Sequence, residues 1–206
     1  MEFFPKLRQS SSGFLKRMRE YSRISHSAEI GRRYFATNAF DGILTVLGIL
    51  FGGFVGNLRD PSVIVITGLG ASVAMGVSGF WGTYEAEKAE RTLALKELER
   101  HTISNLEDTA IGRAARFATV YVSFIDGIAP FLFALVVISP FLFFAHLFDV
   151  TQMYFVAFGL AFLSLAALGV FLGSVSGGNK LLTGAKMVLA GVICSVLSIL
   201  LIGGAA

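Results

Sequence analysis

Residues 36–56, which read ATNAFDGILTVLGILFGGFVG, decide the fold class of this chain. In these 21 positions there is one charged residue, Asp41. A helix of about 20 apolar residues crosses the hydrocarbon core of a bilayer, which is about 30 Å thick. We therefore expect a transmembrane helix here. Similar apolar runs at about 62–83, 118–145, 152–173 and 183–203 predict four more spans.

The composition of the whole chain agrees with a membrane protein. Of the 206 residues, 54% are hydrophobic and 15% are charged, whereas a soluble domain carries about a quarter charged residues. This composition excludes a soluble enzyme, and the single Cys194 excludes an internal disulfide. The basic residues are too dispersed among glutamates to predict nucleic-acid binding. The fold class expected is an all-α integral membrane protein with five transmembrane helices.

The positions of Lys and Arg predict the orientation of the chain. Fourteen of the 17 basic residues fall within 1–35 and 84–117, and such segments face the cytoplasm. We expect residues 1–35 to be a basic, amphipathic N-terminal segment that lies on the cytoplasmic leaflet or packs against 84–117. Residues 36–83 would hold transmembrane helices 1 and 2, and 118–206 helices 3 to 5, with the C-terminus on the opposite side.

Residues 84–117 form a cytoplasmic helical insertion between transmembrane helices 2 and 3 in this prediction. The stretch is rich in Ala, Glu, Lys and Leu and contains no Pro, which favours helix. We expect the second span to continue into it as far as a turn near Ser104 and Asn105. One of these two residues would cap another helix through Glu107 and Asp108.

The insertion carries acidic residues that are candidates for collecting metal ions. Glu97 and His101 are four residues apart and share one helix face, a spacing that can chelate a metal. The alternative is a solvated helix with ion pairs such as Glu87 with Arg91. The full candidate set is Glu85, Glu87, Glu90, Glu97, His101, Glu107 and Asp108.

Two carboxylates lie inside predicted spans, where each costs about 2.5–3.5 kcal/mol at the bilayer centre. Asp41-Gly42-Ile43 in the first span recurs as Asp126-Gly127-Ile128 in the third. Because the first and third spans run in parallel, we expect Asp41 and Asp126 at a similar depth near the cytoplasmic face. Met75, on the returning second span, lies close to that level. Carboxylates with a thioether suit a transition metal; the alternatives are a structural Asp pair and a Met that only packs.

Taken together, these sequence features resemble those of the vacuolar iron transporter family, which includes nodulin-like proteins. The resemblance covers about residues 27–204. Its strongest piece is the segment from Asn38 to Ile49, which is similar to the family's Asp-Gly-(Leu/Ile)-x-(Thr/Ser)-x-(Leu/Phe)-Gly opening. The small-residue second span, the acidic insertion, Pro130 with Pro140 in the third span and the five-span layout add to it.

The resemblance implies a homodimer that exchanges Fe²⁺, or sometimes Mn²⁺, for protons. It implies that Asp41 and Met75 line the path and that the glutamates of the insertion collect metal. The family usually has Met-x-x-Gly-Glu-Tyr in its second span, but this chain reads Met75-Gly76-Val77-Ser78-Gly79-Phe80 and lacks the Glu. Asp126 is the candidate replacement. The insertion is also shorter than in well-known members.

The leading hypothesis is therefore a divalent-metal/proton antiporter that moves metal out of the cytoplasm. Its partners would be membrane lipid, the metal ion, protons and a second copy of the chain, with no prosthetic group. A transporter of another small solute and a non-transporting membrane scaffold or regulatory protein are the alternatives. We expect no enzymatic activity, because the sequence contains neither a nucleophile–base pair nor a three-ligand zinc set.

Overall fold

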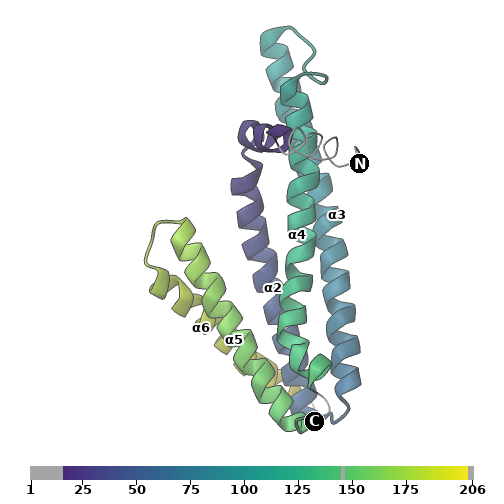
Figure 1. Ribbon diagram of the computed structural model, residues 1–206, viewed down its shortest axis with the longest axis vertical. Coiled ribbons are helices and arrows are strands. Elements are labelled where there is room, and N and C mark those ends of the chain that lie inside the picture. The colour runs from purple at the N-terminus through teal and green to yellow at the C-terminus, as the bar shows by residue number, and fades with distance from the viewer. Residues whose placement is uncertain (1–15, 145–146, 204–206) are drawn as a thin grey trace, which may run out of the picture. The chain divides into compact units, whose positions relative to one another are not determined.

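The computed structural model describes residues 16–144 and 147–203, and every regular element in these ranges is a helix. Five long helices are labelled in Figure 1: α2 (Ser27–Val55), α3 (Pro61–Thr102), α4 (Ala110–Phe143), α5 (Val150–Val175) and α6 (Lys180–Gly203). Residues 16–25 form a further helix before α2. The predicted segment 1–35 and third span 118–145 lie partly outside the described residues.

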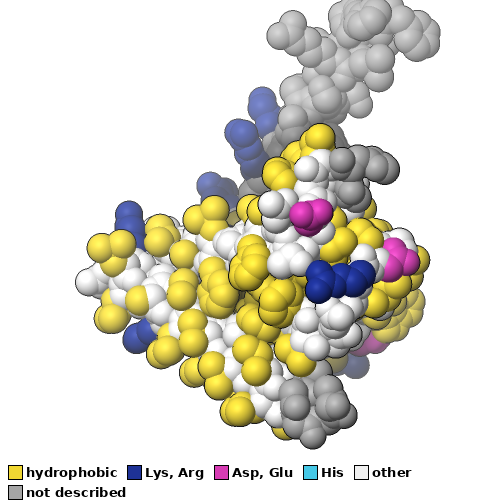
Figure 2. Space-filling model, turned by 90° about the horizontal axis from the view of Figure 1, so that it is seen from below, with side chains coloured by type: hydrophobic (Ala, Val, Ile, Leu, Met, Phe, Trp, Pro, Cys, Tyr) yellow, Lys and Arg dark blue, Asp and Glu magenta, His cyan; other side chains and the backbone are white. Residues whose placement is uncertain are grey.

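All five long helices are long and apolar enough to cross a membrane, which confirms the prediction of five such helices. Their apolar side chains face outward as well as inward: Ile66 is 68% exposed, Leu163 66% and Leu200 67%. In the view of Figure 2, hydrophobic side chains are spread over the whole described surface, and charged side chains lie singly among them or toward its edges. Because water does not tolerate so much exposed apolar surface, the chain is an integral membrane protein.

Helix α3 is about twice as long as a span requires. Its 42 residues extend over about 63 Å at 1.5 Å per residue, so the predicted continuation of the second span into 84–102 is confirmed. The predicted turn near Ser104 and Asn105 is also confirmed.

The expected helix start at that turn is wrong. Asn105 Oδ1 accepts the Glu107 N–H at 2.9 Å, which closes a turn of the kind that Asn side chains favour over helix. Helix α4 begins only at Ala110, where Thr109 Oγ1 accepts the Gly112 N–H at 3.4 Å. Thr109, and neither Ser104 nor Asn105, is therefore the residue that caps α4.

The chain divides into two compact units. We call the described part of the first, residues 16–34 and 79–126, the extension unit. The second, residues 35–78 and 127–203, is the span unit. The extension unit holds the first helix, the start of α2, the second half of α3 and the first half of α4. The span unit holds the remaining parts of α2, α3 and α4 together with α5 and α6.

Glycines allow the helices of the span unit to approach closely. A Cβ at Gly42 of α2 would lie 2.6 Å from the Cα of Pro130 in α4. A Cβ at Gly169 of α5 would lie 2.6 Å from the Cα of Gly184 in α6. Small residues at helix contacts are the usual means by which membrane helices pack.

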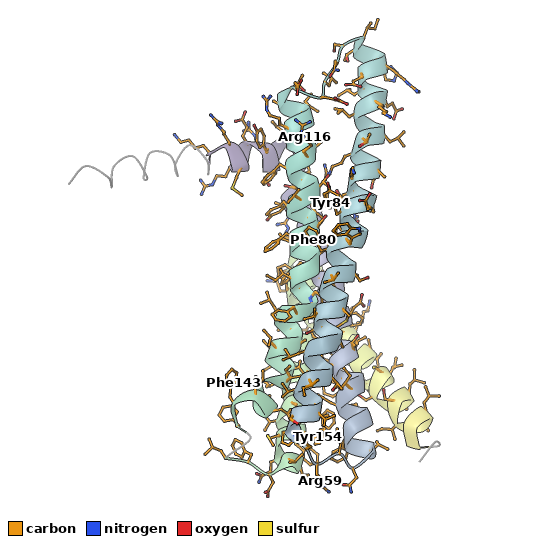
Figure 3. All side chains as sticks on the ribbon, turned by 90° about the vertical axis from the view of Figure 1, so that its right-hand side faces the viewer. Arg59, Phe80, Tyr84, Arg116, Phe143 and Tyr154 are labelled. Atoms are coloured by element: carbon orange, nitrogen blue, oxygen red, sulfur yellow. The ribbon has the colours of Figure 1, made fainter. Side chains whose placement is uncertain are left out.

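An aromatic cluster joins α2, α4 and α5 at one end of the span unit. The ring of Phe51 stacks on Phe158 with centroids 4.4 Å apart, and Phe141 lies edge-on to Tyr154 at 5.1 Å. The Tyr154 hydroxyl donates to the Leu58 carbonyl at 3.2 Å, which ties the turn between α2 and α3 to α5. Tyr154 and Arg59 are labelled at this end in Figure 3.

Candidate functional site

A buried carboxylate lies in the extension unit, at the last residue of its α4 segment. Asp126 of α4 is 2% exposed, and Thr83 of α3 is 7% exposed. The Thr83 hydroxyl donates to Asp126 Oδ2 at 2.5 Å, which is at the short end of the range for O–H···O hydrogen bonds. The sequence identified Asp126 as a site residue but did not identify Thr83 as its donor.

Further buried polar residues follow the same two helices. On α3, Thr83, Glu87 and Arg91 are each four residues apart and therefore share one helix face. Glu87 is 5% exposed, and its Oε2 accepts Arg91 Nη2 at 2.8 Å and Nε at 2.9 Å. The predicted ion pair of Glu87 with Arg91 is thus confirmed, which gives Glu87 a structural partner.

On α4, Ser123 and Thr119 are buried at 0% and 6% exposure. Their hydroxyls donate to carbonyls one turn earlier in the helix: Ser123 to Thr119 at 2.6 Å, and Thr119 to Ala115 at 3.1 Å. We call Thr83, Glu87, Arg91, Thr119, Ser123 and Asp126 the polar seam. The i, i+4 spacing on α3 was the available signal for it, although spacing alone does not show which face is buried.

Asp41 has a different environment from Asp126. It belongs to the span unit and is exposed, as are Thr37 and Thr45, one turn before and one turn after it on α2. Gly48 continues this face, and a Cβ built there would meet nothing within 4 Å. We call Thr37, Asp41, Thr45 and Gly48 the polar α2 face. Within the described span unit, open space therefore lies beside Gly48 on this face.

Met75, the third predicted path residue, is half-buried on α3 within the span unit. The neighbouring Gly76 makes a close helix contact, since a Cβ there would lie 2.8 Å from the Gly127 carbonyl oxygen. Asp41 and Met75 thus belong to the span unit and Asp126 to the extension unit. The convergence of the three side chains remains a prediction.

The acidic residues of the insertion are dispersed over the surface of the extension unit. Glu85, Glu90, Glu97, His101, Glu107 and Asp108 are all exposed. Within the described ranges, no group of three or more His, Cys, Asp or Glu side chains is arranged to hold a metal ion.

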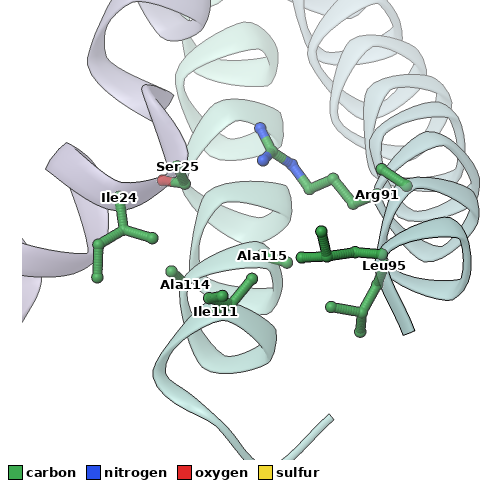
Figure 4. A pocket seen from close by; sticks show the side chains of 9 residues that line it. Ile24, Ser25, Arg91, Leu95, Ile111, Ala114 and Ala115 are labelled. Atoms are coloured by element: carbon green, nitrogen blue, oxygen red, sulfur yellow. The ribbon is translucent and has the colours of Figure 1, made fainter. Parts of the chain in front are cut away.

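An apolar pocket of about 220 Å³ lies where the first helix meets α3 and α4 in the extension unit. Ile24 from the first helix, Leu95 from α3 and Ile111 from α4 line it (Figure 4). The Tyr21 ring also lies 6.1 Å from the Phe117 ring of α4, centroid to centroid. In its described part, the N-terminal segment therefore packs against 84–117, the second of the two arrangements expected from the sequence.

The sequence is related to that of an archaeal protein. No known family model matches the chain. The uncharacterized protein MJ0645 of Methanocaldococcus jannaschii is 32% identical to it over 174 residues, which are 83% of this chain and 88% of the archaeal protein. The chain belongs to the same family. The shared sequence extends over most of this chain and therefore over most of the five helices.

In this family member the polar seam provides a chain of hydroxyl and carboxylate groups along the contact of α3 and α4. The Asp126 carboxylate can bind a proton or a cation, and Thr83 can donate to it or rotate away. The Glu87–Arg91 pair neutralises its own charges, so Asp126 is the member of the seam best suited to bind a cation or proton.

Proposed function

We propose that the protein is a membrane transporter that exchanges a divalent transition metal, Fe²⁺ or Mn²⁺, for protons. The observation that carries this proposal is Asp126, a carboxylate that is 2% exposed on a helix long and apolar enough to span a membrane. Ionisable residues in such positions are costly and usually mark ion pathways or proton relays. The resemblance to the vacuolar iron transporter family supports a metal as the cargo.

The proposed coupling needs no nucleotide. A carboxylate cannot hold a proton and a metal dication on the same oxygens at once, so the two ions compete for Asp126 and Asp41. Metal entering from one side releases protons, and a proton gradient drives metal off the site again. Met75 supplies a soft thioether ligand that favours a transition metal over Ca²⁺ or Mg²⁺.

The proposed orientation places residues 1–35 and 84–117 in the cytoplasm, so that metal leaves the cytoplasm when protons enter it. The uneven distribution of Lys and Arg supports this orientation. The exposed acidic residues of the insertion would then raise the metal concentration near the entrance through their negative charge.

The proposal is tested with purified protein in proteoliposomes. Uptake of Fe²⁺, Mn²⁺, Co²⁺ and Zn²⁺ is measured with and without a pH gradient, together with proton movement from a pH-sensitive dye. We expect Asp41→Asn to abolish metal-driven proton movement and Asp126→Asn to weaken it strongly. Met75→Leu should change the preference among metals more than the rate.

The matched control is Glu20→Gln, which removes one exposed carboxylate from the first helix. Its transport should equal that of the unaltered protein. Normal transport of every metal by Asp41→Asn and Asp126→Asn would reject the site, and the transporter of another solute would then be the better hypothesis.

One observation favours a scaffold as the second candidate. The apolar pocket of the extension unit, lined by Ile24, Leu95 and Ile111, suits an apolar side chain from a partner protein. A scaffold would show no metal flux in the proteoliposome assay, and its partner binding would be lost in Leu95→Asp but kept in Asp41→Asn.

A further inference from the structure

A second groove of the extension unit lies between α3 and α4 and contains basic residues. Its volume is about 410 Å³. Lys88 and Arg91 come from α3 and Arg116 from α4, with Tyr84 and Val120 at the apolar side of the groove. Tyr84 and Arg116 are labelled in Figure 3 on the two neighbouring helices. Arg91 and Thr119 of the polar seam and the exposed Glu107 also line this groove, whereas Asp41, Met75 and Asp126 do not.

Two of the three cations are available to a ligand. Arg91 is held by Glu87 through two short contacts to one carboxylate oxygen. In the part of the chain that the structure describes, neither Lys88 nor Arg116 forms an ion pair; Lys88 Nζ lies 5.6 Å from the centre of the Tyr84 ring. Glu107 is the one carboxylate among the described lining residues. The groove therefore keeps a net positive charge.

The groove lies at the end of the apolar part of both helices. Tyr84 precedes Lys88 by one turn, and Val120 follows Arg116 by one turn, about 6 Å along each helix axis. On the side of Tyr84 and Val120, large apolar residues are exposed: Trp81 is 64% exposed, Phe124 58% and Val120 itself 53%. Trp and Tyr gather at the membrane–water interface, so Lys88 and Arg116 lie at the level of the lipid headgroups.

We propose that this groove binds an anionic phospholipid. The phosphate diester lies between Lys88 and Arg116, and the acyl chains follow the exposed face of Trp81, Val120 and Phe124. Charge complementarity selects an anionic headgroup over a zwitterionic one. The apolar face that continues from the groove selects a lipid over a soluble phosphate, which would leave that face without a ligand. A lipid bound here joins α3 to α4 beside the polar seam.

The proposal is tested by native mass spectrometry of the full chain in detergent, with equal amounts of phosphatidylglycerol and phosphatidylcholine added. Each cation near a membrane surface contributes roughly fivefold to the binding of anionic lipid, so two contribute about 25-fold. We expect retained phosphatidylglycerol to exceed phosphatidylcholine, and the Lys88→Gln/Arg116→Gln double variant to lose most of this excess. The control is Lys96→Gln/Arg100→Gln, which removes the same charge from exposed positions further along α3 and should keep the excess.

Three results would overturn the proposal: equal retention of the two lipids by the unaltered protein, equal loss in the two double variants, or displacement of phosphatidylglycerol by millimolar inorganic phosphate. The last result would show that a soluble phosphate is the ligand. If a double variant misfolds, the salt dependence of lipid binding by the unaltered protein still tests the proposal. The excess of phosphatidylglycerol should fall steadily as NaCl is raised, and an excess that does not depend on salt contradicts a site made by Lys88 and Arg116.

Discussion

Thr83→Val is the substitution that tests the polar seam most directly. Valine has nearly the shape of threonine, so the change removes the hydroxyl while keeping the packing of a side chain that is 7% exposed. The lost bond is the 2.5 Å donation to Asp126 Oδ2. A buried acceptor that loses its donor keeps the cost of its desolvation, about 1–3 kcal/mol. We expect Thr83→Val to lower the free energy of unfolding by about 1–3 kcal/mol.

The assay is unfolding in mixed micelles, followed by circular dichroism, for Thr83→Val, Asp126→Ala and the double variant. The coupling energy of this cycle isolates the bond between the two side chains. Thr92→Val is the control, because Thr92 is exposed on the same helix and exposed substitutions usually cost less than about 0.5 kcal/mol. If Thr83→Val costs no more than Thr92→Val, or if the coupling energy is below about 0.5 kcal/mol, the Thr83 hydroxyl does not hold Asp126.

Two further predictions concern stability. Gly42→Ala places a Cβ 2.6 Å from the Cα of Pro130 and should destabilise the chain by about 1–3 kcal/mol through overpacking. Gly159→Ala, with open space around it, should not, and equal melting temperatures of the two variants would contradict the close contact at Gly42. Asp60 precedes Pro61 at the start of α3, and hydrogen bonds from the Ser62 hydroxyl and backbone N–H lower the pKa of its carboxyl. The stabilising effect of Asp60 should be complete above the ordinary pKa of an aspartate and be lost as the pH falls through the lowered pKa. To check this, the melting temperatures of the unaltered protein and of Asp60→Ala are compared over a range of pH.

The apolar runs predicted the spans because hydrophobic length alone decides which segments can cross a bilayer. The continuation of α3 was equally predictable, since nothing between residues 84 and 102 breaks a helix. The start of α4 was not. Asn105 and Thr109 both carry side chains that can cap a helix, and the choice depends on which backbone N–H each oxygen reaches in the folded turn.

The two Asp-Gly-Ile segments have the same sequence, but the burial of their carboxylates differs and was not predictable from the sequence. The repeat suggested equivalent residues, yet Asp126 is 2% exposed and Asp41 is exposed. Each is followed by a glycine at a close helix contact, Gly42 with Pro130 and Gly127 with Gly76. The local motif is thus the same in both helices, whereas the burial of the carboxylate depends on the neighbouring helix that faces it. For the same reason, the sequence did not predict that Thr83 is the hydrogen-bond donor to Asp126.

The polar α2 face leads to the last prediction. A carboxylate exposed to lipid costs about 2.5–3.5 kcal/mol at the bilayer centre and less toward the cytoplasmic face, where Asp41 is expected. Thr37 and Thr45 extend the same polar surface. A second copy of the chain would remove this cost by covering the face, and Gly48, with nothing within 4 Å of a Cβ, would let the second helix approach closely. Around a two-fold axis, residues near the axis contact their own copies.

Gly48→Cys in a Cys194→Ala background should therefore form a disulfide-linked dimer when membranes are oxidised, seen as a band of doubled mass that a reductant removes. Gly159→Cys in the same background is the control, because a Cβ at Gly159 of α5 also meets nothing within 4 Å but no polar residue requires that face to be covered. Cross-linking at Gly159 and none at Gly48 would place the interface on α5. Asp41 would then face lipid or water in a single chain, and its role would have to be explained without a second copy.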